Sequence, residues 1–289
     1  SLSELVRLRA EYPAALLLAG GTDVGLWTTK QFRDIGDMIF IGNAPELQRI
    51  ERDQAFLRIG CAVSLTDSLA AIVEHYPQLK ELRERFASTP VRNAGTLGGN
   101  VANGSPIGDS MPALIALGTK VLMRGPLGQR TLELEDLYIG YMRKDMRADE
   151  FIESLLVPLP DANWQMRCYK VSKRFDSDIS AVCAAFSVRL EAGLVVDCRV
   201  VFGGMAATVK RAAHCEQQLI AKAWTEETLE QAQAALDEDY QPLSDMRASA
   251  HYRQQCAKNL LYRFYLETRL HQPLPNERVR VIDVSQEQS

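Results

Sequence analysis

Cysteine pairs and clustered histidines are missing from this chain of 289 residues. No C-x-x-C occurs, and no cysteine stands at metal-site spacing from a histidine; the six cysteines are Cys61, Cys168, Cys183, Cys198, Cys215 and Cys256. We therefore expect no metal site and no ordinary iron–sulfur cluster here, only reduced thiols of the kind found in cytoplasmic proteins. The four histidines fall in predicted helices away from the motifs below, so hydrolytic and acyl-transfer chemistry would lack a base.

Long apolar runs and basic runs are absent as well. The longest apolar stretches, residues 14–19 and 181–186, are far too short to cross a bilayer. The net charge is -4, and the largest basic group is the short set Lys170, Lys173 and Arg174. This gives no basic face for nucleic acid, so we expect neither a membrane nor a nucleic acid as partner. The 46% of apolar residues indicates a globular chain, long enough for two domains.

The first 160 residues alternate short helices with short strands. Helical spacing predicts a helix over residues 2–11, opened by the capping box Ser1-Leu-Ser-Glu4. A β–loop–α–β unit with two buried strands is expected over residues 14–41. Further expected elements are strands at residues 56–59, 119–123, 129–132 and 150–157 and helices at residues 67–74, 79–86 and 112–117, with Asp67 as N-cap of the first of these helices.

Glycine and proline concentrate between residues 88 and 112. Because these residues favour unusual dihedral angles or interrupt helices, we expect a folded loop without regular helix there. The pattern changes after residue 160, where three strands at residues 165–172, 180–190 and 195–203 predict an antiparallel meander. Helices at residues 208–221, 225–238 and 245–270 follow. We expect an α+β fold with one domain over residues 1–160 and a smaller one over residues 161–289, the latter a three-stranded antiparallel sheet with a helical bundle.

A first glycine loop follows a predicted strand and opens a helix. It contains Leu17, Leu18, Ala19, Gly20, Gly21, Thr22, Asp23 and Val24. Small residues let successive N–H groups converge at the positive end of a helix, an arrangement that suits a pyrophosphate. A plain β–α turn, in which the glycines only supply positive φ, is the alternative.

A second glycine loop occupies residues 94–103, and its candidate ligand contacts are Thr96, Leu97, Gly98, Gly99, Asn100 and Asn103. By itself it is compatible with a surface corner, but two such loops in one domain could clamp a dinucleotide from both sides. Neither matches the Rossmann or Walker A pattern, so a dinucleotide would lie in another fold. Asp109 is a good N-cap for the helix after it, and as a ligand it should accept from hydroxyl groups, since its charge repels a pyrophosphate. Asp23 is equally suited to be an N-cap or a ligand.

The two loops resemble the FAD-binding domain of molybdenum hydroxylases, which include xanthine dehydrogenases, aldehyde oxidoreductases, carbon monoxide dehydrogenases and 4-hydroxybenzoyl-CoA reductases. The matching motifs are A-G-G-T-D at residues 19–23, N-A-G-T-L-G-G-N at residues 93–100 and S-P-I-G-D-S at residues 105–110. V-F-G-G-M-A at residues 201–206 resembles the xanthine dehydrogenase branch in particular. The resemblance covers essentially the whole chain, as a two-subdomain FAD-binding domain followed by the family's smaller C-terminal flavoprotein domain.

The resemblance implies a role for each matching position. Residues 17–24 would wrap the pyrophosphate of FAD, and residues 96–100 would contact its phosphate and ribityl parts. Asp109 would also bind FAD, Phe86 would lie against the adenine, and Ile152 and Lys170 would contact the flavin end. From the residues alone, Phe86 and Ile152 are expected in the core and Lys170 is expected to be a solvated strand residue.

The resemblance further implies an electron-transfer module of xanthine dehydrogenase. Electrons would arrive from 2Fe-2S centres in a ferredoxin-like domain, expected before Ser1, and would leave to NAD⁺ during oxidation of hypoxanthine or xanthine. A molybdopterin-binding large subunit would be the other partner. Two alternatives stay open, namely the medium FAD subunit of a carbon monoxide dehydrogenase or aldehyde oxidoreductase with another acceptor, and a non-catalytic nucleotide-binding assembly module.

This sequence departs from the family pattern in one loop. The family's mobile loop near the flavin often carries two adjacent acids, whereas residues 173–179 read K-R-F-D-S-D-I, with a serine in place of one acid. Whether this loop controls the flavin potential and the access of nicotinamide, as the family pattern implies, therefore stays an open question. The first glycine loop also lacks the histidine that some related FAD enzymes use for covalent attachment, so we expect dissociable, non-covalent FAD.

Overall fold

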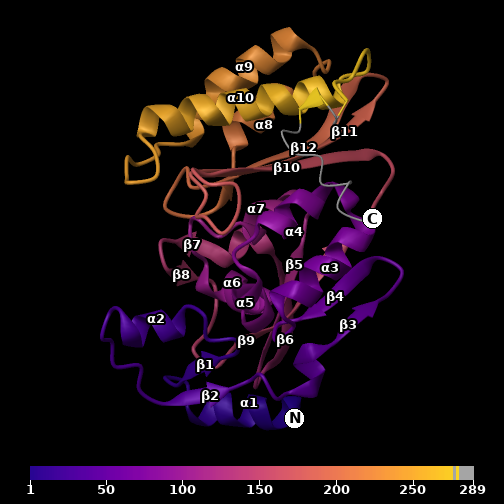
Figure 1. Cartoon of the computed structure of the whole chain (residues 1–289). Helices are drawn as coiled ribbons and strands as arrows, with labels where there is room; N and C mark the ends of the chain where they lie inside the picture. The colour runs from indigo at the N-terminus through magenta and orange to yellow at the C-terminus, as the bar shows by residue number, and fades with distance from the viewer. Residues whose placement is uncertain (276–277, 280–289) are drawn as a thin grey trace, which may run out of the picture.

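The structure is a computed structural model that describes residues 1–275 and 278–279 (Figure 1). An antiparallel five-stranded sheet in the order β3-β4-β9-β5-β6 is the centre of the N-terminal part. Its strands are β3 (Ile50–Arg52), β4 (Phe56–Gly60), β5 (Lys120–Gly125), β6 (Gly128–Glu133) and β9 (Phe151–Pro158). The central strand β9 is buried along most of its length, including the polar residues Glu153 and Ser154.

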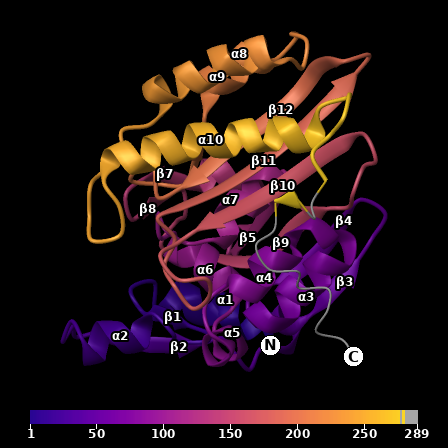
Figure 2. The same ribbon diagram turned by 45° about the horizontal axis from the view of Figure 1, so that its top comes forward.

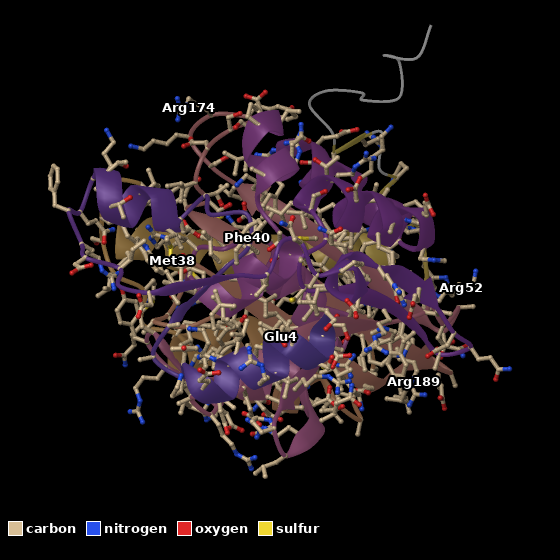
Figure 3. The ribbon with its side chains drawn as sticks, turned by 90° about the horizontal axis from the view of Figure 1, so that it is seen from below. Glu4, Met38, Phe40, Arg52, Arg174 and Arg189 are labelled. Carbon is tan, nitrogen blue, oxygen red and sulfur yellow. The ribbon has the colours of Figure 1, made fainter. Side chains whose placement is uncertain are left out.

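A smaller parallel pair of strands holds the first glycine loop. Strands β1 (Leu16–Leu18) and β2 (Met38–Phe40) pair in parallel across α2 (Val24–Thr29), which confirms the expected β–loop–α–β unit. Helix α1 (Leu2–Glu11) precedes them, and the Ser1 hydroxyl accepts from the Glu4 N–H as the capping box predicts. The expectation of two buried strands was wrong. The residues of β1 are only half-buried, and Met38 and Phe40 of β2 are 48% and 55% exposed (Figure 3).

Short helices connect these sheets to the rest of the chain. They are α3 (Leu65–His75), α4 (Lys80–Arg85), α5 (Thr89–Ala94), α6 (Leu97–Asn103) and α7 (Ser110–Ala116), with the 3₁₀ turns η1 (Pro45–Gln48), η2 (Pro77–Leu79) and η3 (Leu134–Leu137) and the hairpin β7 (Tyr138–Gly140) and β8 (Arg143–Lys144). The expected helix-free loop over residues 88–112 was wrong, since α5, α6 and the start of α7 lie there. Helix α3 begins earlier than expected because Ser64, and not Asp67, is its N-cap.

The C-terminal part is an antiparallel sheet covered by helices. Strands β10 (Trp164–Val171), β11 (Val182–Glu191) and β12 (Leu194–Gly203) form the predicted meander, and the short β13 (Lys210–Arg211) adds a fourth strand. Helices α8 (Ala213–Leu219), α9 (Glu226–Asp239) and α10 (Ala250–Thr268) lie on one face of this sheet (Figure 2). Because β13 occupies the start of the helix expected at residues 208–221, α8 is shorter than predicted.

The β10–β13 sheet separates two hydrophobic cores. On β11, Val182, Ala184 and Phe186 pack into the core beneath helices α8–α10. The alternate residues Cys183 and Ala185 belong to the N-terminal core, on the side where α7 contacts β11 and β12. One strand therefore contributes its two faces to two cores, so the N-terminal and C-terminal parts share a wall.

Candidate cofactor-binding site

Both glycine loops line one cavity of about 310 Å³. It lies where β1, α2 and α6 meet β8 and β9, at the lower left of Figure 1. Fourteen of the residues singled out in the sequence line it: Leu17, Leu18, Ala19, Gly20, Gly21, Thr22, Asp23, Val24, Thr96, Gly98, Gly99, Asn100, Asn103 and Ile152. The structure thus brings together two segments that are far apart in the chain.

The two loops touch through their main chains. A Cβ atom at Gly20 would lie 1.9 Å from the carbonyl oxygen of Ala94, so only glycine fits there. Gly21 has a φ of +69°, which also favours glycine. On the other side of the second loop, a Cβ at Gly98 would lie 2.4 Å from the Cβ of Cys61. Backbone packing therefore fixes the separation of the loops.

Thr96 organises the second loop. Its hydroxyl oxygen accepts from the Gly99 N–H at 3.0 Å and makes Thr96 the N-cap of α6. A Cβ at Gly99 would lie 2.7 Å from this hydroxyl. Asn100 accepts a hydrogen bond from Ser110 at 2.5 Å, whereas Leu97 is fully buried in the core and does not line the cavity.

Asp23 links the two loops. Its carboxylate accepts a hydrogen bond from the side-chain amide of Asn103 at 2.9 Å and makes no capping bond to α2. Asp23 thus stands at the N-cap position of α2, as expected, but its side chain does not cap the helix and bonds to Asn103 of α6 instead. Burial raises the pKa of the Asp23 carboxyl, because the charged form is the harder one to desolvate.

Lys144 is a lining residue that the sequence did not single out. It is the one lysine or arginine among the lining residues, and burial lowers the pKa of its amine. Other lining residues outside the two motifs are Leu16, Trp27, Ile41, Cys61, Leu65, Met142 and Phe151. They come from separate elements and share no sequence pattern, so only the fold identifies them.

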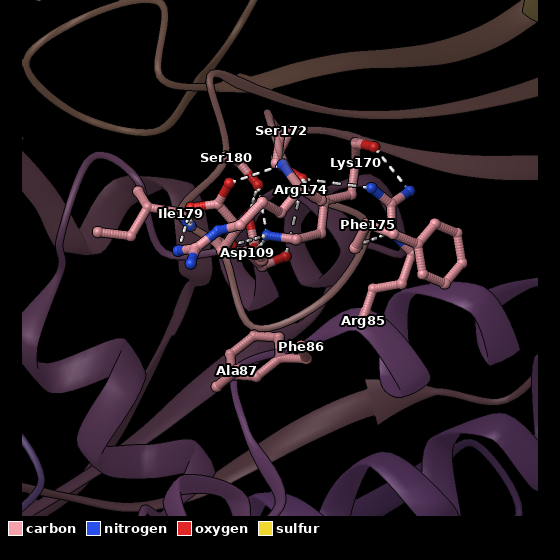
Figure 4. A network of polar contacts seen from close by, with 12 residues as sticks. Arg85, Phe86, Ala87, Asp109, Lys170, Ser172, Arg174, Phe175, Ile179 and Ser180 are labelled. Atoms are coloured by element: carbon pink, nitrogen blue, oxygen red, sulfur yellow. Dashed lines mark hydrogen bonds and ion pairs between the residues drawn. The ribbon is translucent and has the colours of Figure 1, made fainter. Parts of the chain in front are cut away.

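Asp109 and Lys170 form a buried ion pair (Figure 4). The Lys170 amine donates to the Asp109 carboxylate at 2.5 Å and to the Ser180 hydroxyl at 2.8 Å, and Ser180 donates to Asp109 at 2.6 Å. Lys170 is only 6% exposed, so the expectation of a solvated strand residue was wrong. Asp109 makes no capping bond to α7, because Lys170 and Ser180 take its oxygens. Neither residue of the pair lines the cavity.

Phe86 is also buried and does not line the cavity. Its neighbour Arg85 connects the N-terminal part to the segment between β10 and β11, donating to the carbonyl oxygens of Lys170 and Phe175, both at 2.8 Å (Figure 4). The Arg85 guanidinium also lies 4.8 Å from the centre of the Phe175 ring. The segment that departs from the family pattern is thus attached to α4.

The described residues contain no group of three or more His, Cys, Asp or Glu side chains that could hold a metal ion. No helix within them has both the length and the apolar character needed to cross a membrane. Three of the four histidines lie in helices as expected, but His271 follows the end of α10.

Comparison with known proteins matches two family models to this chain. Residues 1–160 match the FAD binding domain in molybdopterin dehydrogenase, and residues 167–268 match the CO dehydrogenase flavoprotein C-terminal domain. Relatives include a nicotinate hydroxylase of Emericella nidulans, 30% identical over 92% of this chain and 21% of its own length, and a xanthine dehydrogenase of the same organism, 29% identical over 92% and 20%. The chain thus spans about a fifth of the length of these relatives. The xanthine dehydrogenase FAD-binding subunit of Escherichia coli O157:H7 is 29% identical over 88% of each chain.

Solved structures of related enzymes are also similar to this chain in fold. A carbon monoxide dehydrogenase from Hydrogenophaga pseudoflava matches with a TM-score of 0.84 and 28% identity, over 91% of this chain and 92% of that one. Quinoline 2-oxidoreductase from Pseudomonas putida 86 matches with a TM-score of 0.79 and 26% identity, over 92% and 93%. The chain therefore belongs, as its motifs predicted, to the family of FAD-binding domains of molybdopterin dehydrogenases.

Proposed function

We propose that this chain is the FAD-carrying electron-transfer module of a xanthine dehydrogenase, taking electrons from 2Fe-2S centres of a partner domain and delivering them to NAD⁺ during purine oxidation in the cytoplasm. The molybdopterin would lie on a large partner subunit. When bound, FAD supplies the redox chemistry, accepting single electrons and releasing a hydride. The chain itself binds and orients it.

The observation that supports this proposal is the shared cavity of the two glycine loops. Gly20 and Gly98 let the two loops pack closely against Ala94 and Cys61, and this packing brings the main chain of both loops to the wall of one cavity. Main-chain N–H groups near the start of a helix suit a diphosphate. Lys144 adds a positive charge to the same wall. Asp23, whose carboxylate would repel a phosphate, is better suited to accept from a ribose or ribityl hydroxyl.

Four further residues belong to the proposed FAD site without lining the cavity: Phe86, Leu97, Asp109 and Lys170. Leu97 positions the first turn of α6 from the core side. Asp109 and Lys170 join the start of α7 to β10. Contact of Phe86 with the adenine, and of Lys170 with the flavin, stays a prediction.

A second candidate function is the medium FAD subunit of a carbon monoxide dehydrogenase, with an acceptor other than NAD⁺. The similarity to the carbon monoxide dehydrogenase of Hydrogenophaga pseudoflava, at a TM-score of 0.84, favours it. The similarity to the Escherichia coli subunit over 88% of each chain favours the xanthine dehydrogenase assignment.

The purified chain, loaded with FAD and kept without oxygen, tests both functions. We expect a flavin absorption spectrum that NADH bleaches, because the acceptor reaction is reversible in principle. A flavin that NADH does not bleach would contradict the first function and leave the second. Treatment with acid should release the flavin completely, and flavin fluorescence that stays on the denatured chain would contradict non-covalent binding.

A variant of the second loop tests the site itself. Gly99→Asp places a Cβ and a carboxylate next to Thr96 and the proposed phosphate position, so it should abolish flavin binding. Gly25→Asp is the matched control, because a Cβ at Gly25 meets no atom within 4 Å and Gly25 does not line the cavity. Full FAD content in Gly99→Asp would refute the assignment of this loop.

A further inference from the structure

A second cavity, of about 630 Å³, lies at the junction of the N-terminal and C-terminal parts. It shares no lining residue with the FAD cavity. Its walls come from α3, β4, α7 and β9 on one side and from β10, β11 and β12 on the other. Helix α3 and strand β4 lie below β10 in both views (Figures 1 and 2). Small-molecule sites usually measure about 300–1,000 Å³, so this cavity has room for a ligand of its own.

Arg199 is fixed in this cavity by two flat contacts. Its guanidinium lies over the ring of Trp164, 5.3 Å from the ring centre. A Cβ at Gly118 would lie 2.7–2.9 Å from three guanidinium atoms, so the Gly118 main chain also lies against the face of the group. Gly118 has a φ of +74°, which favours glycine. Neither contact is a hydrogen bond from the N–H groups of Arg199.

Arg199 has no counter-charge within the part of the chain that the structure describes, where it forms neither an ion pair nor a hydrogen bond. The other two strong bases in the cavity are paired. Lys120 lies 3.1 Å from Glu133, and Arg211 lies 2.9 Å from Glu135. Arg199 is therefore the one lysine or arginine in this lining that has no ion-pair partner among the described residues.

The remaining charged groups in the lining do not neutralise Arg199. Asp161 is exposed, and its carboxylate accepts two hydrogen bonds from Asn163. His75 lies at the C-terminal end of α3. Much of the wall is apolar or aromatic, with Phe56, Tyr76, Leu117, Pro158, Pro160 and Met166.

We propose that this cavity binds a small planar molecule that carries one carboxylate or phosphate. The oxyanion would accept the parallel N–H donors of Arg199, the geometry for which a guanidinium is best suited. The flat apolar body would lie against the side chains of Phe56 and Tyr76. Because the two parts of the chain each supply a wall, bound ligand would join them.

Titration of the flavin-loaded protein with benzoate, phenyl phosphate and inorganic phosphate, followed by calorimetry, tests this inference. We expect at least one aromatic probe to bind with a Kd of about 1 mM or tighter, and inorganic phosphate to bind at least about threefold more weakly. Arg199→Met should weaken the aromatic probe about tenfold or more, because the charge-assisted hydrogen bonds are lost. Flavin content, which depends on the other cavity, reports on folding of the variant.

Two further variants keep the test decisive. Arg199→Lys retains the charge and should still weaken binding about threefold or more, because it lacks the planar pair of donors. Lys258→Met is the control, since Lys258 is paired with Asp237 and does not line this cavity, and it should bind as the wild type does. Equal affinity in both Arg199 variants and the wild type, tighter binding of inorganic phosphate than of the aromatic probes, or no saturable binding of any probe would overturn the proposal.

Discussion

Lys144 lies in the FAD cavity without an ion-pair partner among the described residues. Burial lowers the pKa of its amine below the ordinary value of 10.5, because the neutral form is easier to bury. A diphosphate in contact with the amine would act in the opposite direction, since a nearby anion favours the charged form. If FAD binds in this cavity as proposed, Lys144 couples its binding to protonation.

We predict that the affinity for FAD falls as the pH rises through the alkaline range below 10.5. The pKa of Lys144 is higher in the complex than in the free protein, so affinity is greatest below the free-protein value and decreases above it. Lys144→Met should bind FAD about tenfold more weakly at neutral pH and lose this pH response. Quenching of flavin fluorescence gives the affinity at each pH.

Arg143→Met serves as the control for this measurement, because Arg143 is exposed and does not line the cavity. It should bind FAD as the wild type does at every pH. A Lys144→Met protein that keeps the wild-type pH response would show that another group, on the protein or on FAD, is responsible.

Helices α5 and α6 are secondary-structure elements that the sequence did not predict. The strands β10, β11 and β12 were predictable, because period-two patterning and apolar runs express local geometry. The helices were not, because glycine and proline lower helix propensity, while in the fold Pro90 stands in a first turn and Thr96 supplies a cap. Gly98 is required there by contact with Cys61, a tertiary reason that composition does not express.

In the candidate site too, local sequence motifs were predictable and contacts between distant segments were not. The two loops were found because each is continuous in sequence. Lys144 and Met142 were not, because the β7–β8 hairpin reaches the cavity only through the fold. Asp109 and Asp23 were given a plausible N-cap role that longer-range partners, Lys170 and Asn103, displace.

The ion pair between α7 and β10 makes a stability prediction. Lys170→Met removes one partner and leaves the Asp109 carboxylate buried, so we expect the free energy of unfolding to fall by about 3–5 kcal/mol. The double variant with Asp109→Asn should lose less, since no buried charge stays unpaired. Urea denaturation of the flavin-free protein measures both.

Lys120→Met, which removes an exposed ion pair, is the comparison for Lys170→Met. The Lys120–Glu133 pair is about 40% exposed on both sides, and its loss should change the unfolding free energy by less than about 1 kcal/mol. A similarly small loss in Lys170→Met would contradict the account of the buried pair.

The sheet between the two cores couples the stability of the N-terminal part to that of the C-terminal part. Because β11 contributes side chains to both cores, neither part can lose its packing without exposing a face of the other. A ligand that binds the N-terminal part should therefore stabilise the C-terminal part as well.

We predict a single unfolding transition that FAD shifts as a unit. Free FAD at a hundredfold excess over its Kd should add about 2.7 kcal/mol to the unfolding free energy. Circular dichroism should report the same shift as the fluorescence of a Trp27→Phe variant, in which the remaining tryptophans, Trp164 and Trp224, both lie in the C-terminal part. Two transitions, with only one of them responsive to FAD, would mean that the shared sheet does not couple the parts.

The contact of Gly20 with the carbonyl of Ala94 has a consequence for biosynthesis. When only the first glycine loop has left the ribosome, the second loop, which lines the same cavity, has not yet been made. Phe151 and Ile152 on β9, which also line the cavity, emerge later still. If this cavity holds the flavin as proposed, capture of the flavin would wait until the nascent chain has passed β9. The yellow colour of the protein would thus mark the completion of its N-terminal fold, and unloaded chains would accumulate when translation is interrupted before that point.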